Sequence, residues 1–221
     1  MEYIDLSHTV FDGLITYKGL PAPVICDYLS RDASKSFYEE GTSFQIGRID
    51  MVANTGTYID CPFHRYEDGH DLSEINIDQM ANLPSVLINA FGHQAIGPEF
   101  FFHHNLTGKA VLVHTGWSAH WNSERYFSGH PFLTEAAAVY LRENGAVLVG
   151  IDSHNIDDTS GKRRPVHSIL LSAEILIVEH LTNLDQIPAG EFLFSAVPPK
   201  VKGMGTFPVR AFATINPRPP F

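Results

Sequence analysis

Four short, continuously apolar runs constrain what this chain can fold into more than any other feature. They lie at residues 85–91, 110–114, 146–152 and 175–179. Runs of this length without polar alternation are typical of strands buried on both faces. A helical pattern over residues 134–144 separates two of the runs, with Thr134 as its N-cap and Gly145 after its end. Strand, helix and strand with short connections favour a right-handed crossover between parallel strands.

Four weaker strand patterns complete the expected sheet, at residues 3–8, 44–51, 192–197 and 209–215. The first two alternate apolar and polar side chains, as half-buried strands do. Asp71 or Ser73 is placed to cap a short helix around residues 74–81. No repeat, low-complexity tract or linker interrupts the chain, so we predict one α/β domain, residues 1–221, with a mixed sheet.

Residues 54–64, Asn-Thr-Gly-Thr-Tyr-Ile-Asp-Cys-Pro-Phe-His, hold the densest group of chemically committed side chains. Pro62 lies between Asp60 and His64 and disfavours a regular helix, because it lacks an N–H and clashes with the preceding turn. Gly56 admits backbone conformations that a Cβ would block. We expect a stiff, irregular loop that holds a carboxylate and an imidazole. This pair suits a divalent metal or acid–base chemistry; the alternative is a turn-capping Asp beside a partly buried His.

This stretch resembles the signature of the cyclase family of metal-dependent hydrolases, which includes bacterial kynurenine formamidase and isatin hydrolase. The family pattern reads H-x-G-T-H-x-D-x-P-x-H, and the matching residues are Gly56, Thr57, Asp60, Pro62 and His64. Asn54 and Tyr58 stand where the family has two metal-binding histidines. The resemblance therefore implies the family's fold, while the two replacements fall on its metal centre.

Later blocks extend the resemblance to about residues 3–215. They resemble G-I-D-x-x-S-x-D at 150–157, P-x-H-x-x-L-L at 165–171, I-x-E-x-L-x-N-L at 177–184 and the family's S-P-V-R-A close at 207–211. The resemblance implies a mixed, barrel-like sheet with flanking helices, in the swivelling β/β/α arrangement. It also implies a homodimer or homotetramer.

The resemblance further implies roles for individual residues. Asp60 matches a metal ligand, His167 and Glu179 match positions that reach the metal centre, and His64 matches the histidine proposed as general base. In such a site the metal lowers the pKa of the attacking water and polarises the scissile carbonyl. The competing interpretations are a structural histidine at position 167 and an ion pair between Glu179 and Arg210.

Three further side chains are candidates for substrate contact: Tyr17, Phe63 and His154. Tyr17 lies in a segment, residues 11–23, whose glycine and proline breaks predict an irregular loop; in the family the equivalent loop covers the substrate. The alternative for Tyr17 is an ordinary core aromatic. His154 follows the end of a strand and either replaces a lost ligand or is a loop residue.

The two replacements leave three arrangements open. In the first, Asn54 offers a carbonyl oxygen beside Asp60 and Glu179, and this oxygen-rich set favours manganese or magnesium over zinc. In the second, four residues hold one zinc or manganese ion in a shifted site: Asp60, His64, His167 and Glu179. In the third no metal binds, and acid–base chemistry is done by His64, Asp60 and Tyr58.

The leading hypothesis is hydrolysis of a small cyclic or N-acyl amide, imide or lactone by metal-assisted attack of water, with a histidine as general base. One alternative is a non-hydrolytic cyclase, dehydratase or isomerase that works without metal, with His64 as base and Tyr58 as acid. The other is a catalytically inactive homologue that binds a small ligand.

Composition argues against several other classes. The net charge of −10 disfavours nucleic acid and anionic membranes as partners, and no run reaches the ~18 apolar residues of a membrane span. Cys26 and Cys61 form neither a disulfide framework nor a C-x-x-C metal site, and no secretory leader is evident. We expect a cytoplasmic protein whose partner is a small-molecule substrate.

Overall fold

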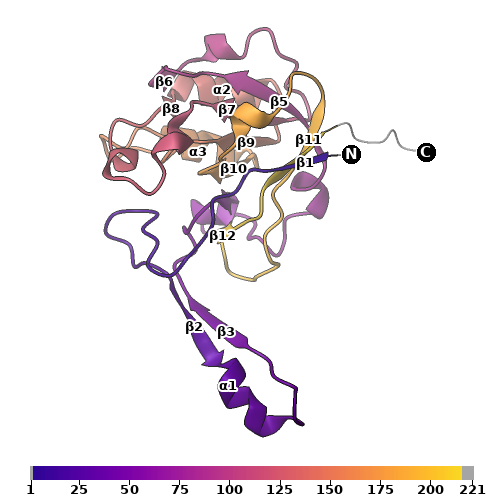
Figure 1. The fold of residues 1–221 in the computed structure, drawn as a ribbon. Coiled ribbons are helices and arrows are strands. Elements are labelled where there is room, and N and C mark those ends of the chain that lie inside the picture. Colours follow the sequence, from indigo (N-terminus) through magenta and orange to yellow (C-terminus); the bar gives the residue numbers. More distant parts are fainter. Residues whose placement is uncertain (1, 216–221) are drawn as a thin grey trace, which may run out of the picture.

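The structure, a computed structural model, describes residues 2–215. Nine strands form one mixed sheet in the order β1-β13-β11-β5-β7-β9-β10-β4-β12, and the sheet curls into a half-barrel (Figure 1). The strands are β1 Glu2–Asp5, β4 Tyr58–Asp60, β5 Leu83–Asn89, β7 Ala110–His114, β9 Leu148–Ile151, β10 Leu176–Glu179, β11 Phe192–Ser195, β12 Thr206–Pro208 and β13 Phe212–Ile215. The predicted α/β fold with a mixed, barrel-like sheet is confirmed.

The centre of the sheet is parallel, from β5 through β7 and β9 to β10. Helix α2, Glu135–Glu143, crosses between β7 and β9, and its N-cap Thr134 accepts a hydrogen bond from the Ala137 N–H. Gly145 follows the helix with a φ of +75°. The predicted helix between parallel strands and both of its end signals are therefore confirmed, while the right hand of the crossover stays a prediction. Helix α3, Pro165–Ser172, joins β9 to β10 and was not predicted, although a proline at the first helical position is a start signal.

Each face of the sheet buries its own hydrophobic cluster, because side chains alternate along a strand. The cluster under α2 and α3 includes Val111, Val149 and Ile177. The opposite cluster includes their neighbours Leu112, Leu148 and Val178, together with Ile59 of β4. Asp60 follows Ile59 and Glu179 lies two residues after Ile177. Both carboxylates therefore project from the face that α2 and α3 cover.

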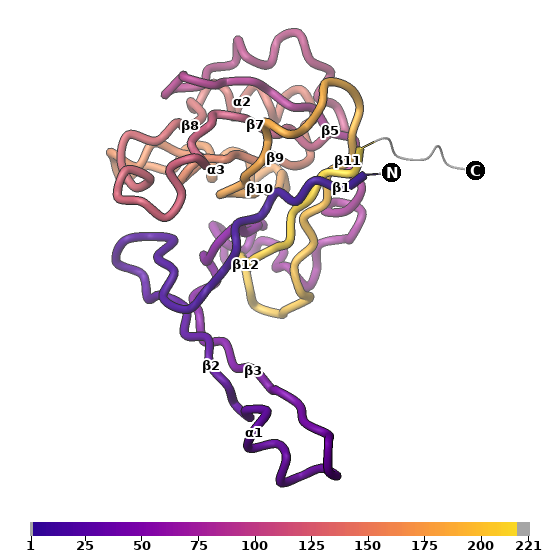
Figure 2. Tube along the Cα trace, in the orientation of Figure 1, coloured from indigo at the N-terminus to yellow at the C-terminus, as the bar shows by residue number. Residues whose placement is uncertain are grey.

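Residues 24–50 form an arm that extends away from the body of the molecule (Figures 1 and 2). Strand β2, Val24–Leu29, pairs antiparallel with β3, Ile46–Asp50, and helix α1, Arg31–Ser34, with the 3₁₀ turn Lys35–Phe37, forms its tip. Every residue of β3 is exposed. The predicted strand at 44–51 is present, but its half-buried character is wrong because, within residues 2–215, β3 pairs with β2 alone.

Two other local predictions need correction. The stretch at 54–64 is not a loop throughout, since it contains β4 and a 3₁₀ helix, Pro62–His64, with Pro62 at the first position, where a missing N–H costs nothing. The helix expected around 74–81 is only a 3₁₀ turn, Ile77–Gln79, because the Asp71 carboxylate binds Ser73 and Gly203 instead of capping a helix.

The remaining elements are short. They are β6 Ala95–Ile96, β8 Phe132–Leu133 and the 3₁₀ turns Pro98–Phe100, Trp117–His120, Glu124–Phe127 and Leu184–Gln186. Among residues 2–215, none of the helices has the length and apolar character that crossing a membrane requires.

Candidate metal centre

Strand register brings the side chains of the site together on one face of the sheet. In β4, Tyr58 and Asp60 are two residues apart and point the same way. Strand β10 pairs with β4 so that Glu179 lies opposite Tyr58, and β12 pairs on the other side so that Thr206 lies opposite Asp60. The site is therefore mounted on three paired strands, which hold these groups more rigidly than the expected loop would.

Hydrogen bonds among Asp60, Thr206 and His64 fix the proton on the His64 ring. Thr206 Oγ1 donates to Asp60 Oδ1, which uses its single hydrogen. His64 Nδ1 lies 2.7 Å from the same hydroxyl and must therefore be the donor in that contact. The lone pair of His64 is then on Nε2. Since the side chain is 34% exposed, this nitrogen is available to a metal ion or to a proton from water.

Asp157 orients His167 and begins α3 with the same carboxylate. Its Oδ1 accepts the Val166 N–H at 2.8 Å, and its Oδ2 accepts the His167 N–H at 3.0 Å and the ring Nδ1–H at 2.6 Å. The Nε2 atom of His167 consequently faces the other two acids, 3.7 Å from Asp60 Oδ2 and 3.7 Å from Glu179 Oε1.

Asp60, His64 and His167 form the one group of three or more metal-binding side chains within residues 2–215, with ligand atoms all within 4.8 Å of one another. Asp60 is fully buried, and its Oδ2 has no hydrogen-bond partner among these residues. Burial lowers the pKa of His167, but the hydrogen bond to Asp157 and the nearby carboxylates of Asp60 and Glu179 outweigh it and raise the pKa to about 10. Groups that hold a proton this firmly would also attract a divalent cation. The residues present therefore fit a metal ion.

Glu179 lies beside this group and is itself fully hydrogen-bonded. Its Oε1 accepts the Ile156 N–H at 2.6 Å, and its Oε2 accepts the Tyr58 hydroxyl at 2.5 Å, with the Tyr17 hydroxyl 3.1 Å away. Burial raises the pKa of Glu179. The alternative ion pair with Arg210 does not form, because Arg210 binds Asp5 at the surface, 2.6 Å away.

Tyr58 stands at a family histidine position but offers different chemistry. Burial and then the charge of Glu179 raise the pKa of Tyr58 well above its usual value, so the phenol stays protonated. A protonated phenol is a poor metal ligand and, here, a poor acid. Its geometry is that of a group that positions Glu179, and its predicted catalytic role remains a prediction.

The other predicted site residues lie around this centre. Asn54 is half-buried in the segment before β4, and its side chain makes no hydrogen bond within residues 2–215; its role as ligand remains a prediction. Tyr17 donates to the His154 carbonyl at 2.7 Å and accepts from Asn155 Nδ2 at 3.0 Å, with the Tyr58 hydroxyl oxygen also 3.0 Å away. Phe63 packs against the cluster on the opposite face of the sheet.

His154 is buried among aromatic rings, with its ring centre 4.5 Å from that of Tyr17 and 5.5 Å from that of Tyr126. Burial lowers its pKa to about 3, so the ring is neutral. His154 is not in the group of possible metal ligands. The structure therefore does not support the hypothesis that His154 replaces a lost ligand.

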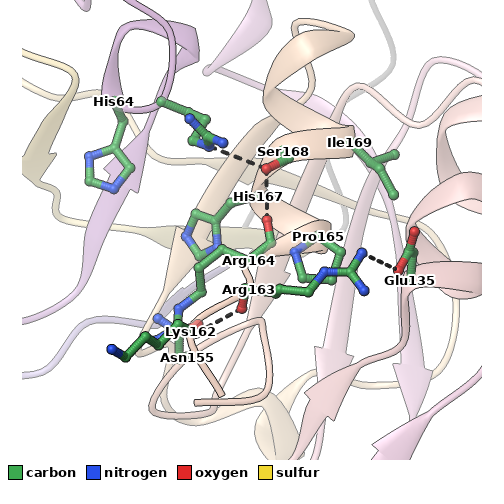
Figure 3. Close-up of a pocket in the computed structure, with 11 residues that line it drawn as sticks. His64, Glu135, Asn155, Lys162, Arg163, Arg164, Pro165, His167, Ser168 and Ile169 are labelled. Carbon is green, nitrogen blue, oxygen red and sulfur yellow. Dashed lines mark hydrogen bonds and ion pairs between the residues drawn. The ribbon is translucent and has the colours of Figure 1, made fainter. Parts of the chain in front are cut away.

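A cavity of about 540 Å³ opens beside the two histidines of the group (Figure 3). Its lining includes His64, His167, Asn155, Arg65, Lys162 and Arg164. Tyr17, Phe63 and His154 are not among the residues that line it, so their contact with substrate remains a prediction. The cavity gives a small molecule access to the Asp60–His64–His167 group.

Comparison with known proteins agrees with this geometry. The Cyclase family model matches residues 4–158, a range that contains Asp60, His64 and Asp157.

The chain belongs to the cyclase family.

Individual members of the cyclase family resemble it over nearly its whole length. The kynurenine formamidase of Bacillus cytotoxicus is 29% identical over 211 residues, which cover 95% of this chain and 96% of the relative. A predicted metal-dependent hydrolase from Bacillus stearothermophilus superposes with a TM-score of 0.75 at 28% identity, covering 96% of this chain and 97% of that one. Isatin hydrolase A from Labrenzia aggregata shares the fold, with a TM-score of 0.80 at 22% identity over 96% of this chain and 93% of that one.

Sequence reasoning missed two residues that this family member uses to orient its site, Thr206 and Asp157. Asp157 was visible only as part of a motif block, since nothing in a ten-residue spacing indicates a contact with His167. Thr206 had one signal, the preceding Gly205. A Cβ at Gly205 would collide with the backbone of His64, so the glycine marks where β12 approaches the 3₁₀ helix.

Proposed function

We propose that this chain hydrolyses the C–N bond of a small cyclic or N-acyl amide, with one divalent metal ion held by Asp60, His64 and His167. The observation that carries the proposal is the convergence of a buried, unpartnered carboxylate oxygen with two imidazoles, all within 4.8 Å. The kynurenine formamidases among its relatives support an amide substrate, and the B. stearothermophilus structure supports metal dependence.

A bound metal would supply Lewis-acid polarisation of the carbonyl and a water of lowered pKa. Two nitrogen donors and one or two carboxylates suit zinc or manganese. Glu179 lies 3.7 Å from His167 Nε2 and would stand next to such an ion. The Tyr58 hydroxyl donates a hydrogen bond to the Glu179 carboxylate, and the Tyr17 hydroxyl lies against the same oxygen. Both contacts hold the carboxylate in place.

Hydrogen bonds within the protein orient both imidazole rings without a bound ligand. Thr206 and Asp157 each hold a ring nitrogen Nδ1, of His64 and of His167, in a hydrogen bond, so Nε2 is the nitrogen of each ring left for a metal ion. His167 would release its Nε2 proton on binding the ion, since its pKa is about 10. In the hydrolysis, the water oxygen bonds to the acyl carbon, the C–N bond breaks and the amine nitrogen gains a proton. His64 lines the cavity and has the exposure needed to accept the water proton as general base, if the metal does not occupy its lone pair.

The test is metal content by plasma mass spectrometry, together with amide turnover, for the wild type and two variants. Asp60→Asn should lose both the metal and activity. His64→Gln separates the two uses of His64, because loss of metal identifies a ligand, whereas retained metal with a kcat reduced ~10²-fold or more identifies a base. The control is Asp78→Asn, an exposed acid on the 3₁₀ turn at Ile77–Gln79, which should change neither quantity.

A wild type that neither contains nor takes up zinc or manganese would overturn the metal centre. Turnover without net addition of water would replace hydrolysis by lyase or isomerase chemistry. If the metal-loaded protein turned over no amide, imide or lactone, the remaining hypothesis would be a catalytically inactive protein that binds a small ligand.

We further propose that the chain assembles as a homodimer or homotetramer through its arm. Eight large apolar side chains are exposed there: Val24, Ile25, Tyr28, Phe37, Tyr38, Phe44, Ile46 and Ile49. Together they present on the order of 800 Å², about what one partner buries in a standard interface. An isolated two-stranded ribbon is at best marginally stable in water. The arm is apolar at all times, so its partner must be present whenever the chain is. A second copy of this chain meets that condition.

Light scattering tests this assembly. The wild type should have at least twice the 24.6 kDa mass of one chain, and a Tyr28→Ser, Phe37→Ser double variant should shift toward one chain. The control is Ile77→Ser, which removes an equally exposed side chain from the body, 67% exposed, and should leave the mass unchanged. A monomeric wild type at micromolar concentration would contradict the proposal.

We also propose a cytoplasmic location. Cys26 is exposed and Cys61 buried, and both are free thiols, which suits a reducing compartment.

A further inference from the structure

The cavity beside the candidate metal centre has a charge opposite to that of the chain. The chain holds 15 lysines and arginines against 25 acids. The cavity, in contrast, is lined by four cations, Arg65, Lys162, Arg163 and Arg164, and by one acid, Glu135. A local excess of positive charge in an acidic protein favours an anionic ligand at that point.

The four cations differ in how far they are already neutralised. Arg163 pairs with Glu135 at 3.3 Å, so its charge is balanced. Arg65 donates through Nε to Ser168 Oγ at 3.2 Å and lies over the Tyr66 ring. Lys162 has no ion pair or hydrogen bond within residues 2–215. Arg164 forms no ion pair in that part of the chain either, although Asp158 is near enough for the charge of Arg164 to help lower the pKa of that carboxyl, after its hydrogen bonds to Ser160. Arg65, Lys162 and Arg164 therefore carry charge that no ion pair balances, and of the three Arg65 already spends its Nε donor on Ser168.

Arg164 is held in place without losing its ability to bind an anion. It is half-buried, and a single nitrogen, Nη1, donates to the backbone carbonyls of Asp158, Gly161 and Arg163 at 3.3, 2.9 and 2.8 Å. A guanidinium has five N–H groups in a planar fork that matches a carboxylate. The loop therefore fixes one side of the fork and leaves the rest unpaired.

The position of Arg164 ties it to the chemistry. It directly precedes α3, the helix that carries His167, and both residues line the same cavity (Figure 3). Because Asp157 fixes the start of this helix, Arg164 and His167 are held by one local structure. A ligand bound to Arg164 is thus placed in a defined relation to the group at the other end of the cavity.

We infer that the substrate is an amide that bears a carboxylate, with Arg164 as the principal anion-binding residue and Lys162 as a second charge. This rests on the proposed function and adds the substrate class. The carboxylate would lie at the arginine end of the cavity while the scissile C–N bond lies at Asp60, His64 and His167. A carboxylate can bind the planar fork of a guanidinium through two parallel hydrogen bonds.

The experiment compares two amides that differ only in the anionic group, 2-formamidobenzoate and formanilide, with the metal-loaded enzyme. The wild type should prefer the acid by at least tenfold in kcat/KM. Arg164→Gln should reduce this preference at least tenfold, mainly through KM, and Lys162→Gln should reduce it about threefold, since it lacks the fork. Arg164→Lys should restore part of the preference. The control, Arg142→Gln, changes an exposed arginine of α2 that does not line the cavity and should leave the preference as it is.

Arg164→Gln also removes hydrogen bonds within its loop, so its melting temperature is measured alongside. Lys162→Gln has no such contact to lose and keeps the test valid if the first variant unfolds. Equal turnover of both amides by the wild type, or a preference that survives in both variants, would overturn the inference while leaving the hydrolase intact.

If neither amide is turned over, the proposed function fails, and binding decides the inference separately. Benzoate should then bind the wild type more tightly than benzamide by calorimetry, and Arg164→Gln should abolish the difference. Stronger binding of inorganic phosphate than of benzoate, or no difference between benzoate and benzamide, would contradict a carboxylate site.

Discussion

Strands β3 and β4 follow each other along the chain and have opposite surroundings. Every residue of β3 is exposed and every residue of β4 is buried. The cause is the number of neighbouring strands: in the part of the chain that the structure describes, β3 pairs only with β2, whereas β4 lies between β10 and β12. Both strands end in isoleucine followed by aspartate, Ile49-Asp50 in β3 and Ile59-Asp60 in β4. The comparison teaches that burial, and with it the chemistry of a side chain, depends on what pairs with a strand more than on its own sequence.

Replacing the buried carboxylate that begins α3 should have the largest effect. Asp157→Asn leaves at least one of three donors unpaired, so we expect the free energy of unfolding to fall by about 3 kcal/mol. Because His167 loses its orientation, metal affinity should fall about 10–100-fold. Urea denaturation and metal titration measure the two effects. Asp68→Asn, at an exposed carboxylate that makes no hydrogen bond or ion pair within residues 2–215, should change neither; a similar loss in both variants would contradict the role given to Asp157.

Acid should weaken the body through its buried histidines, while the arm, residues 24–50, contains no histidine. Burial lowers the pKa of His154 to about 3, so between pH 6.5 and pH 3 the unfolded chain binds a proton that the folded chain does not. Stability should therefore fall as the pH drops through 6.5, by about 2 kcal/mol at pH 5 from this residue alone. His8, whose pKa burial lowers to about 4, adds to the trend.

Urea denaturation of metal-free protein at pH 7 and pH 5 checks this dependence. His167 acts in the opposite direction, since its pKa of about 10 keeps it protonated in the folded chain while the unfolded chain gains this proton only as the pH falls through 6.5. It therefore offsets the loss by about 0.8 kcal/mol between pH 7 and pH 5, less than His154 and His8 remove. His154→Phe should reduce the slope, and an unchanged slope would show that other groups cause the acid loss.

The same substitution in the two regions should give different results. Tyr58→Phe removes the hydroxyl that donates to Glu179 at 2.5 Å, and we expect a cost of about 1–2 kcal/mol because the buried carboxylate loses a donor. Tyr28→Phe, at a side chain 76% exposed on the arm, should leave the melting temperature unchanged. Equal shifts in the two variants would contradict the contrast between body and arm.

The smallest effect is expected from an ion pair at the tip of the arm. Lys35 Nζ lies 2.8 Å from Asp32, nearly as close as His167 is to Asp157, at 2.6 Å. The arm pair is mostly exposed, so water screens it. Lys35→Gln should produce no measurable change in melting temperature, and a clear decrease would show that the arm is buried in an assembly.

The sequence patterns predicted the parts of the fold that depend on local signals. The apolar runs at 110–114 and 175–179 became central strands, and Thr134 and Gly145 bound α2 as expected. The patterns failed where tertiary pairing decides. Residues 58–60 become a strand only because β10 and β12 pair with them, and β3 is exposed only because nothing covers it.

For the site, the resemblance selected Asp60, His64 and His167, which the structure brings together. It could not show that Tyr58 donates to Glu179, because that contact follows from strand register across more than a hundred residues. Nor could it separate Phe63, which faces the opposite core, from its neighbour His64, since the direction of each side chain is set by the 3₁₀ helix that Pro62 begins.

The double use of Asp157 has a consequence for how the molecule opens. The amide hydrogens of Val166 and His167 and the ring hydrogen of His167 all rest on one carboxylate, so none can exchange with solvent while that carboxylate keeps its place. The first turn of α3 and the orientation of the His167 ring should therefore be lost together and form together. Deuterium uptake at the amides of Val166 and His167 therefore measures how often Asp157 releases them and His167 loses its orientation. A ligand that binds the ordered site should slow this uptake, and a tighter ligand should slow it more.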